Sequence, residues 1–241
     1  MPSNSKILPL FFRLEDNLNT IFKEIKHHKA DTLIHLAAMI DIKKCEEEKD
    51  LCYSINIDGT KKVFLAAIKA KIKRFIYVST SHVYETTNKL TQIDVSAKLN
   101  PKSFYAKSKL KAEKELKNIA KENPDIQLSI VRVFSILSKK MRPGSLEKKI
   151  HSLANFKKIE YIEGLNNVRD FSNSEDICKN LIKLSKSKIF PDIVNLCSEK
   201  PVIIFNLVKD IYAKYNLDFT NLYRFKIKKN KNYLIGKKTK F

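Results

Sequence analysis

The sequence predicts an α/β protein whose parallel sheet carries helices on both faces. Short apolar runs such as TLIHLAA and RFIYVST lack the alternation of half-exposed strands, as expected for strands covered on both sides. Segments with helical periodicity alternate with these runs along the chain. With 241 residues, 43% of them hydrophobic, the chain suits one large domain or one domain with a small lobe.

The elements of the first third follow one another as helix, strand, helix and strand. Residues 14–30 repeat apolar side chains at helical spacing, and residues 32–38 form a continuous apolar run. Residues 43–71, interrupted only by Gly59, predict a helix, and residues 74–80 predict a second buried strand. This rhythm is typical of a parallel sheet with crossover helices.

The remainder of the chain continues the same alternation. A long loop over residues 81–103 precedes a helix over residues 105–123, which Pro124 ends. The later expected elements are a strand at 126–134, helices at 145–156 and 174–187, a strand at 192–197 and a helix at 205–215. The tail after about residue 217 is basic and patternless, and we expect an edge element or disorder there.

The formal net charge of +21 raises nucleic acid or an anionic surface as a partner. The basic residues are nearly all lysines spread along the chain without a nucleic-acid-binding motif, so a lysine-rich surface is favoured and no specific nucleic acid is expected. The apolar runs are too short for a membrane span, which predicts a cytoplasmic protein. Four scattered cysteines predict neither a metal site nor disulfides, and buried or partly buried free thiols are favoured.

The stretch SFYAKSKLKAEKEL places Tyr105 and Lys109 four positions apart at the start of a helix. Their side chains then lie on one face, one turn apart. A free phenol with a pKa of about 10 is a poor base, but a neighbouring ammonium stabilises the phenolate, so Tyr105 can serve as a general acid or base. Thr80, at the end of a predicted strand, can hold the same substrate oxygen. The alternative is that Tyr105 covers a core edge and Lys109 is one of many solvated lysines.

Several motifs occur in a fixed order. The segments are DTLIHLAA, NIDGTKKVF, YVSTSHVYE, NPKSFYAKSKLKAE, VRDFSNSEDI and IVNLCSEKPVIIFNLV. This order resembles the extended short-chain dehydrogenase/reductases, specifically the nucleotide-sugar epimerases, dehydratases and reductases. The interval from Thr80 to Tyr105 is the usual one in that family. The resemblance covers roughly residues 16–215.

The resemblance implies two domains with distinct roles. Residues 1–135 would form a partial Rossmann domain that binds NAD or NADP and carries the Tyr/Lys helix. Residues 136–241 would form a small substrate-binding lobe, partly interleaved with the first domain, and a basic tail. A nucleotide sugar would be the substrate, and a homodimer is a further implied partner.

The resemblance also assigns roles to individual residues. Tyr105 would be the acid/base on a sugar oxygen, Lys109 would bind the nicotinamide ribose and lower the tyrosine pKa, and Thr80 would bind the same sugar oxygen. Asn56 would lie in the supporting helix beside the active site. The cofactor-lining residues would be Leu36, Ala37, Ala38, Val78, Tyr105, Lys109 and Phe134, and the substrate-binding residues would be Thr80, Ser135 and Arg169. The implied site contains no metal.

Two of these roles have simple alternatives. Arg169 would pair with the diphosphate of the nucleotide sugar, a task suited to a guanidinium. Its alternative is a surface ion pair with Asp170 or Glu175. The alternative for Asn56 is a polar helix residue that faces solvent.

The chain departs from the family pattern at its beginning. The family opens with a strand and a glycine-rich turn that approaches the dinucleotide phosphates, and this sequence contains neither. We therefore expect a chain shortened at its N-terminus, with an exposed hydrophobic sheet edge and weakened or lost cofactor binding. Three functions stay open: an NAD(P)-dependent epimerase, dehydratase or reductase, a non-catalytic remnant that binds a nucleotide sugar or a homologous partner, and a basic interaction protein.

Overall fold

The computed structural model describes residues 6–138, 145–157, 164–222 and 231–241. The chain divides into two compact units, and each is described by itself. The first unit comprises Met1–Ser79, Pro101–Val131 and Ser187–Asp192. The second unit comprises Thr80–Asn100, Arg132–Lys186 and Ile193–Phe241.

The strands of the first unit are β1 (Thr32–His35), β2 (Arg74–Thr80) and β4 (Gln127–Val133), in that spatial order. β1 and β2 run parallel. β1 lies at the end of the strand order and is therefore an edge strand. The predicted α/β fold with a parallel sheet is confirmed, because buried apolar strands here alternate with helices along the chain.

The helices of this unit are α1 (Leu18–His27), α2 (Ile42–Glu47), α3 (Lys49–Tyr53), α4 (Thr60–Lys69) and α5 (Phe104–Lys121). The segment predicted over residues 43–71 is mostly helical, as expected, but it has more than the one interruption predicted at Gly59. It is broken at Glu48, which leaves helical geometry, and a π-helical segment, η1 (Ser54–Gly59), separates α3 from α4. Hydrophobic periodicity does not reveal these breaks, because apolar side chains continue on the same face.

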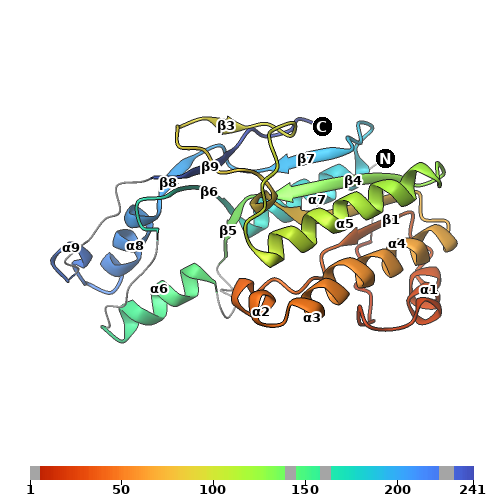
Figure 1. The fold of residues 1–241 in the computed structure, drawn as a ribbon, viewed down its shortest axis with the longest axis horizontal. Helices are drawn as coiled ribbons and strands as arrows, with labels where there is room; N and C mark the ends of the chain where they lie inside the picture. The colour runs from red at the N-terminus through yellow and green to blue at the C-terminus, as the bar shows by residue number, and fades with distance from the viewer. Residues whose placement is uncertain (1–5, 139–144, 158–163, 223–230) are drawn as a thin grey trace. The chain divides into compact units, whose positions relative to one another are not determined.

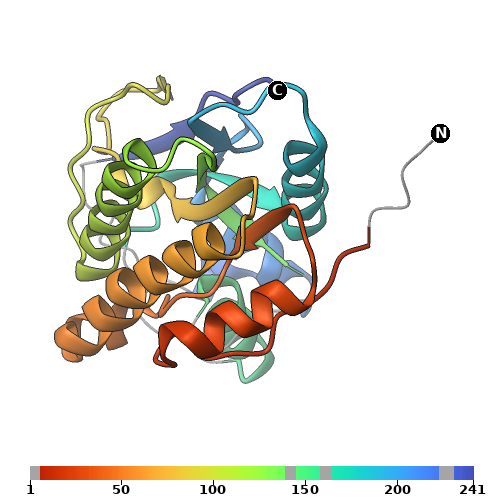
Figure 2. The same ribbon diagram turned by 90° about the vertical axis from the view of Figure 1, so that its right-hand side faces the viewer.

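Helices α1, α4 and α5 cover one face of these strands, and α1 runs beside α4 (Figures 1 and 2). The core between these helices and the strands is built from apolar side chains of both. Its largest members are Ile21, Ile25, Phe64, Phe75, Tyr77, Leu116 and Ile130. Gly59 is required where η1 meets the N-terminal segment, because a Cβ there would lie 2.8 Å from the Cβ of Leu14.

The second unit contains a mixed sheet with the order β3 (Gln92–Ile93), β9 (Tyr233–Gly236), β6 (Val168–Asn173) and β5 (Ser135–Leu137). β8 (Pro201–Ile203) pairs antiparallel with β6. The expectation of an edge element or disorder in the tail is wrong for β9, which has a parallel partner on each side. Its four residues are too few to give a pattern that sequence inspection detects.

The described part of the same unit also holds β7 (Ile193–Leu196) and five helical segments. These are η2 (Ser81–Val83), α6 (Leu146–Asn155), α7 (Ser174–Lys186), α8 (Ile204–Ala213) and α9 (Phe219–Leu222). The main apolar cluster joins α6, α8 and α9.

None of the described helices is long and apolar enough to cross a membrane. The buried-thiol prediction holds for three cysteines and is wrong for Cys178, which is exposed.

Candidate active site

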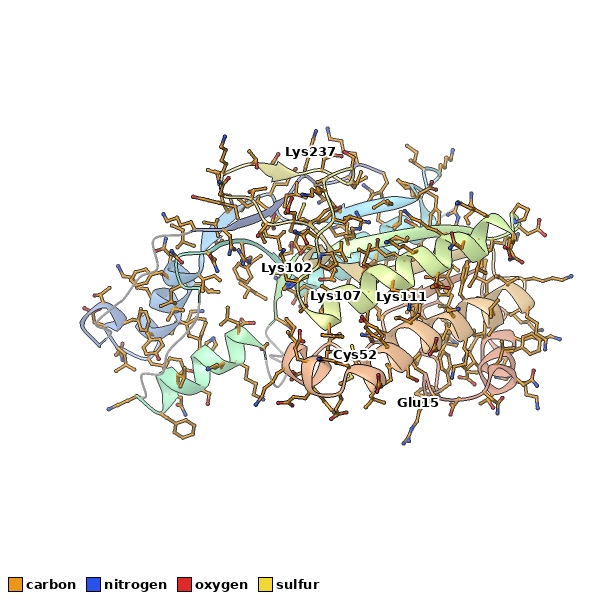
Figure 3. The ribbon with its side chains drawn as sticks, in the orientation of Figure 1. Glu15, Cys52, Lys102, Lys107, Lys111 and Lys237 are labelled. Carbon is orange, nitrogen blue, oxygen red and sulfur yellow. The ribbon has the colours of Figure 1, made fainter. Side chains whose placement is uncertain are left out.

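The N-terminal turn of α5 presents the predicted pair. Ser103 caps the helix, its Oγ accepting from the backbone N of Ala106 at 3.2 Å, so Tyr105 and Lys109 fall one turn apart. Tyr105 is partly buried, whereas Lys109 is only 2% exposed. Lys107 and Lys111 on the same helix are solvent-exposed (Figure 3). The alternative of a solvated Lys109 is therefore wrong.

Lys109 places an ammonium group in an apolar environment. Its Nζ lies 4.2 Å from the centroid of the Tyr77 ring, a cation–π contact. Within the described part of the chain, no acceptor hydrogen-bonds this Nζ and no carboxylate lies within ion-pair distance of it. Burial lowers the pKa of Lys109 to about 7, although the negative charge of Glu113 acts in the opposite direction. Lys109 consequently titrates near neutral pH.

Glu113 lies one further turn along α5 and is also buried. Its Oε1 accepts a hydrogen bond of 2.5 Å from the Oγ of Ser79 at the end of β2. This bond ties α5 to the strand that leads into Thr80. Sequence reasoning missed Glu113, although the spacing of four residues from Lys109 is a signal that would have found it.

Two neighbours of Lys109 stay uncharged. The Nε2 of His35 lies 3.1 Å from the Oγ1 of Thr60, and burial, followed by the charge of Lys109, lowers the pKa of His35 to about 3. Burial, followed by the charge of Glu113, raises the pKa of Tyr77 well above its usual value. Neither residue was among the predicted site residues. Both residues lie within apolar strands, so a search of the sequence for polar clusters does not single them out.

Asn56 is fully buried in the π-helical segment η1, so the alternative of a solvent-facing residue is wrong. Its Oδ1 accepts from Met39 N at 2.8 Å, and its Nδ2 donates to Met39 O and to the Oγ of Ser108, both at 2.9 Å. Ser108 in turn donates to the carbonyl of Tyr105 at 2.8 Å. Asn56 therefore connects the turn after β1 to the first turn of α5.

The turn after β1 contains three of the predicted cofactor-lining residues. Leu36 is 62% exposed, Ala37 is exposed, and Ala38 is partly buried. Val78, near the end of β2, is also partly buried. These apolar side chains thus remain accessible next to strand ends, where ligands of parallel sheets bind.

The second unit holds the other predicted residues: Thr80, Phe134, Ser135 and Arg169. Thr80 is buried, and its Oγ1 accepts from His82 N at 3.2 Å. Phe134 is buried and its backbone N donates to Leu196 O, whereas Ser135 begins β5 and is partly buried. The predicted site residues are thus divided between the two units.

Arg169 is half-buried in β6. Its Nη1 donates to Val168 O at 2.9 Å and to Asn232 O at 3.1 Å, and burial lowers its pKa. The alternative, an ion pair with Asp170, is not formed, because the carboxylate of Asp170 accepts hydrogen bonds from Ser198, Glu199 and Gly236 instead. Nor does any other described carboxylate pair with Arg169. The guanidinium keeps donors for an anion.

Known proteins share sequence and fold with this chain. Residues 13–197 match the model of the NAD dependent epimerase/dehydratase family. A UDP-N-acetyl-alpha-D-glucosaminuronate decarboxylase of Bacillus cytotoxicus is 27% identical over 203 residues, which cover 80% of this chain and 61% of that protein.

Two solved structures share the fold. A UDP-glucose 4-epimerase of Thermotoga maritima with UDP-glucose gives a TM-score of 0.80 at 20% identity, covering 99% of this chain and 80% of that one. A UDP-glucose 4-epimerase of Thermus thermophilus with NAD gives a TM-score of 0.77 at 15% identity. This match covers 89% of this chain and 73% of that one. The chain spans 63%, 39% and 51% of the length of three other curated relatives it matches.

Proposed function

The chain belongs to the NAD dependent epimerase/dehydratase family, and from this membership we propose that it acts on a nucleotide-activated sugar with NAD or NADP as cofactor. The observation that carries the proposal is the buried ammonium of Lys109. A buried charge without a hydrogen-bond acceptor costs several kcal/mol, so a ligand that supplies acceptors would relieve that cost. The hydroxyl groups of a ribose are such acceptors.

The residues of the first unit fit the nicotinamide half of the cofactor. Lys109 would bind the ribose hydroxyls, and the exposed apolar turn at residues 36–38 with Val78 would line the cofactor. Gly59 does not supply a phosphate-binding turn, because it packs against Leu14. When bound, the nicotinamide accepts and returns a hydride.

The chain's own residues would handle the proton. Tyr105 would exchange a proton with the sugar hydroxyl that becomes a carbonyl, and Thr80 would hydrogen-bond the same oxygen. A protonated Lys109, one turn from Tyr105, would favour the phenolate by its charge. Because the pKa of Lys109 is about 7, this support is strongest below pH 7 and declines above it.

The second unit would bind the nucleotide part of the substrate. The Arg169 donors that no described residue occupies suit a diphosphate, and Ser135 would contact the sugar. Relatives with related folds carry UDP-sugars in their names, which supports a nucleoside diphosphate sugar as the substrate class.

The proposal is tested with Tyr105→Phe. We expect the purified chain to retain NAD(P) and to convert a nucleotide sugar such as UDP-glucose, measured by chromatography of the sugar nucleotides. Tyr105→Phe should reduce turnover at least about a hundredfold, the usual contribution of acid–base catalysis, while cofactor and UDP binding persist. Lys107→Met, on the exposed face of α5, is the control and should leave turnover unchanged.

The outcomes separate the competing functions. Unchanged turnover in Tyr105→Phe would exclude the tyrosine mechanism. UDP-glucose binding without cofactor or turnover in the unsubstituted chain would instead indicate a non-catalytic binding protein. Binding of DNA or RNA that falls steeply with salt, in the absence of nucleotide-sugar binding, would favour a basic interaction protein.

A further inference from the structure

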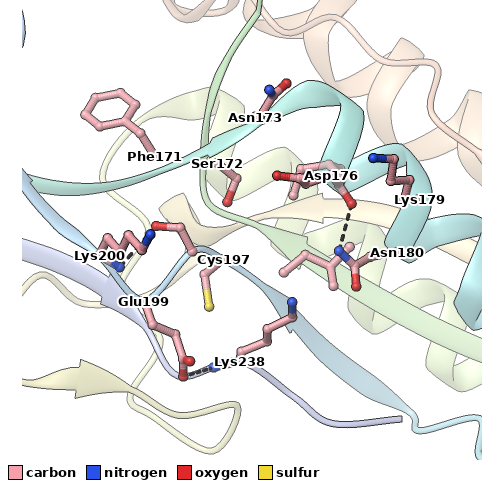
Figure 4. Close-up of a pocket in the computed structure, with 13 residues that line it drawn as sticks. Phe171, Ser172, Asn173, Asp176, Lys179, Asn180, Cys197, Glu199, Lys200 and Lys238 are labelled. Carbon is pink, nitrogen blue, oxygen red and sulfur yellow. Dashed lines mark hydrogen bonds between the residues drawn. The ribbon is translucent and has the colours of Figure 1, made fainter.

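The second unit contains a pocket of about 540 Å³ that none of the predicted site residues lines. It is bounded by the start of α7, the turn after β7 and the segment after β9 (Figure 4). The volume falls within the range of about 300–1,000 Å³ that is common for small-molecule sites. Its polar lining residues are Ser172, Asn173, Asp176, Lys179, Asn180, Ser198, Glu199, Lys200 and Lys238.

A buried carboxylate holds the rim of this pocket in place. Asp170 is fully buried, and its Oδ1 accepts from the backbone N and the Oγ of Ser198, both at 2.7 Å. Its Oδ2 accepts from Glu199 N at 2.9 Å and Gly236 N at 3.3 Å. One side chain thus joins the turn after β7 to the end of β9. Glu199 keeps a φ of +64° in this turn, which the surrounding hydrogen bonds enforce.

The charge in the pocket is predominantly positive. Three lysines line it, Lys179, Lys200 and Lys238, and none of them pairs with a carboxylate in the described part of the chain. Asp176 and Glu199 are the two lining carboxylates, and an oxygen of Glu199 is occupied by the backbone N of Lys238 at 2.9 Å. The Lys238 side chain extends into the pocket toward Asn180 (Figure 4). An anion therefore finds unpaired ammonium groups here.

The pocket lining also includes a hydroxyl group and a thiol group. Ser172 is 7% exposed, and its Oγ is buried without a hydrogen-bond partner among the described residues. Burial, followed by the charge of Asp170, raises the pKa of Cys197 to about 12, so this thiol adds no negative charge at neutral pH. The buried, unpaired hydroxyl is a feature that a bound ligand would explain.

We propose that this pocket binds a small phosphorylated molecule, with Lys238 and Lys200 on its phosphate group and the amide and hydroxyl side chains on its polar body. Three ammonium donors on long side chains suit a phosphate, whose oxygens accept several charge-assisted hydrogen bonds. The lining includes one aromatic ring, Phe171, which favours a compact polar phosphate ester over a nucleotide that needs base stacking. This site is independent of the proposed catalytic function.

The test compares two neighbouring lysines. Glycerol 3-phosphate and inorganic phosphate are titrated separately into the full chain by calorimetry at about 150 mM NaCl, where long-range attraction is screened. We expect saturable binding that Lys238→Met weakens about tenfold. Lys237→Met is the matched control and should bind as the unsubstituted chain does. The Nζ of Lys237 lies 3.8 Å from the Oδ2 of Asp94, and Lys237 does not line the pocket.

A second substitution, Lys200→Met, repeats the test at another wall position, and circular dichroism verifies that each variant is folded. Weaker binding in both pocket variants would support the site. Binding of inorganic phosphate with exclusion of the ester would overturn the proposed ligand class. Equal weakening by Lys237→Met and Lys238→Met, or no saturable binding at millimolar concentrations, would overturn the site and leave only diffuse attraction by the +21 chain.

Discussion

At the scale of single residues, Lys109 is a buried lysine whose burial carries an energetic cost. Its ammonium is buried under Tyr77 and lacks a hydrogen-bond acceptor in the described part of the chain. The unfolded state solvates the same group freely. Folding therefore destabilises the charged form of this lysine, and a bound ligand or deprotonation would relieve the cost.

Replacing Lys109 by methionine should stabilise the fold in a pH-dependent way. The pKa falls from 10.5 in the unfolded chain to about 7 in the folded one, so the unfolded state binds more protons between these values. The free-energy cost of burying the charged ammonium is complete below pH 7 and disappears as the pH rises toward 10.5. The gain in unfolding temperature of Lys109→Met should thus be largest near pH 6 and small near pH 10, at roughly 2–4 °C for each kcal/mol.

Thermal unfolding followed by circular dichroism at pH 6 to 10 measures this difference. Lys107→Met is the control, because Lys107 is exposed on the same helix and should show no comparable pH dependence. A stabilisation by Lys109→Met that is the same at every pH would contradict the assigned burial of charge.

At the scale of elements, the π-helical segment η1 positions the turn after β1 against α5. A π-helical segment displaces side chains from their regular helical directions and often occurs at functional sites. Here it points Asn56 into the interior, where its amide spans Met39 and Ser108. The turn and α5 are therefore held at a fixed separation.

Removing this amide should loosen both elements. We expect Asn56→Ala to destabilise the fold by about 2–3 kcal/mol, because it removes two hydrogen bonds to the backbone of Met39 and one to the buried Ser108 hydroxyl. Hydrogen exchange at residues 36–41 should accelerate. The double variant with Ser108→Ala should lose less than the sum of the single losses, since the two side chains share one hydrogen bond. Additive losses in urea unfolding would show that the two residues act separately.

Gly59 gives a second prediction at this scale. Alanine usually stabilises a helix relative to glycine by roughly 0.5–1 kcal/mol. At position 59 the added Cβ would lie 2.8 Å from the Cβ of Leu14 and 3.1 Å from its carbonyl oxygen, so we expect Gly59→Ala to destabilise by about 1–3 kcal/mol instead. Asp58→Ala, at the exposed neighbouring position, is the control in the same urea titration. A stabilised Gly59→Ala would contradict this packing.

The long periodic elements were predictable from sequence, and the short ones were not. The helices α1, α5 and α7 have enough turns to display an apolar face, and the strand that ends at Thr80 is a clear buried run. By contrast, β3 and β9 have only two and four residues and depend on distant partners. The spacing of Tyr105 and Lys109 is visible in the sequence, but the depth of Lys109 and its contact with Tyr77 are visible only in the folded structure.

At the scale of the whole molecule, the net charge of +21 produces self-repulsion in the folded state. Screening by salt should therefore raise the unfolding temperature by a few degrees. Most of the rise should occur below about 0.1 M NaCl, where the Debye length is still longer than about 10 Å, and the curve should then flatten. Differential scanning calorimetry over this range measures the effect. A temperature that stays constant over the same salt range would show that the lysines are spaced too widely to repel one another.

The position of β9 sets the order in which its sheet is able to form. Residues 233–236 pair with β6 on one side and with β3 on the other, although those partners leave the ribosome much earlier. During synthesis, β3 and β6 emerge before the strand that lies between them. The sheet can be completed only after residues 233–236 have emerged. An early stop codon a few residues before Tyr233 would thus remove an interior strand of this sheet rather than a dispensable extension.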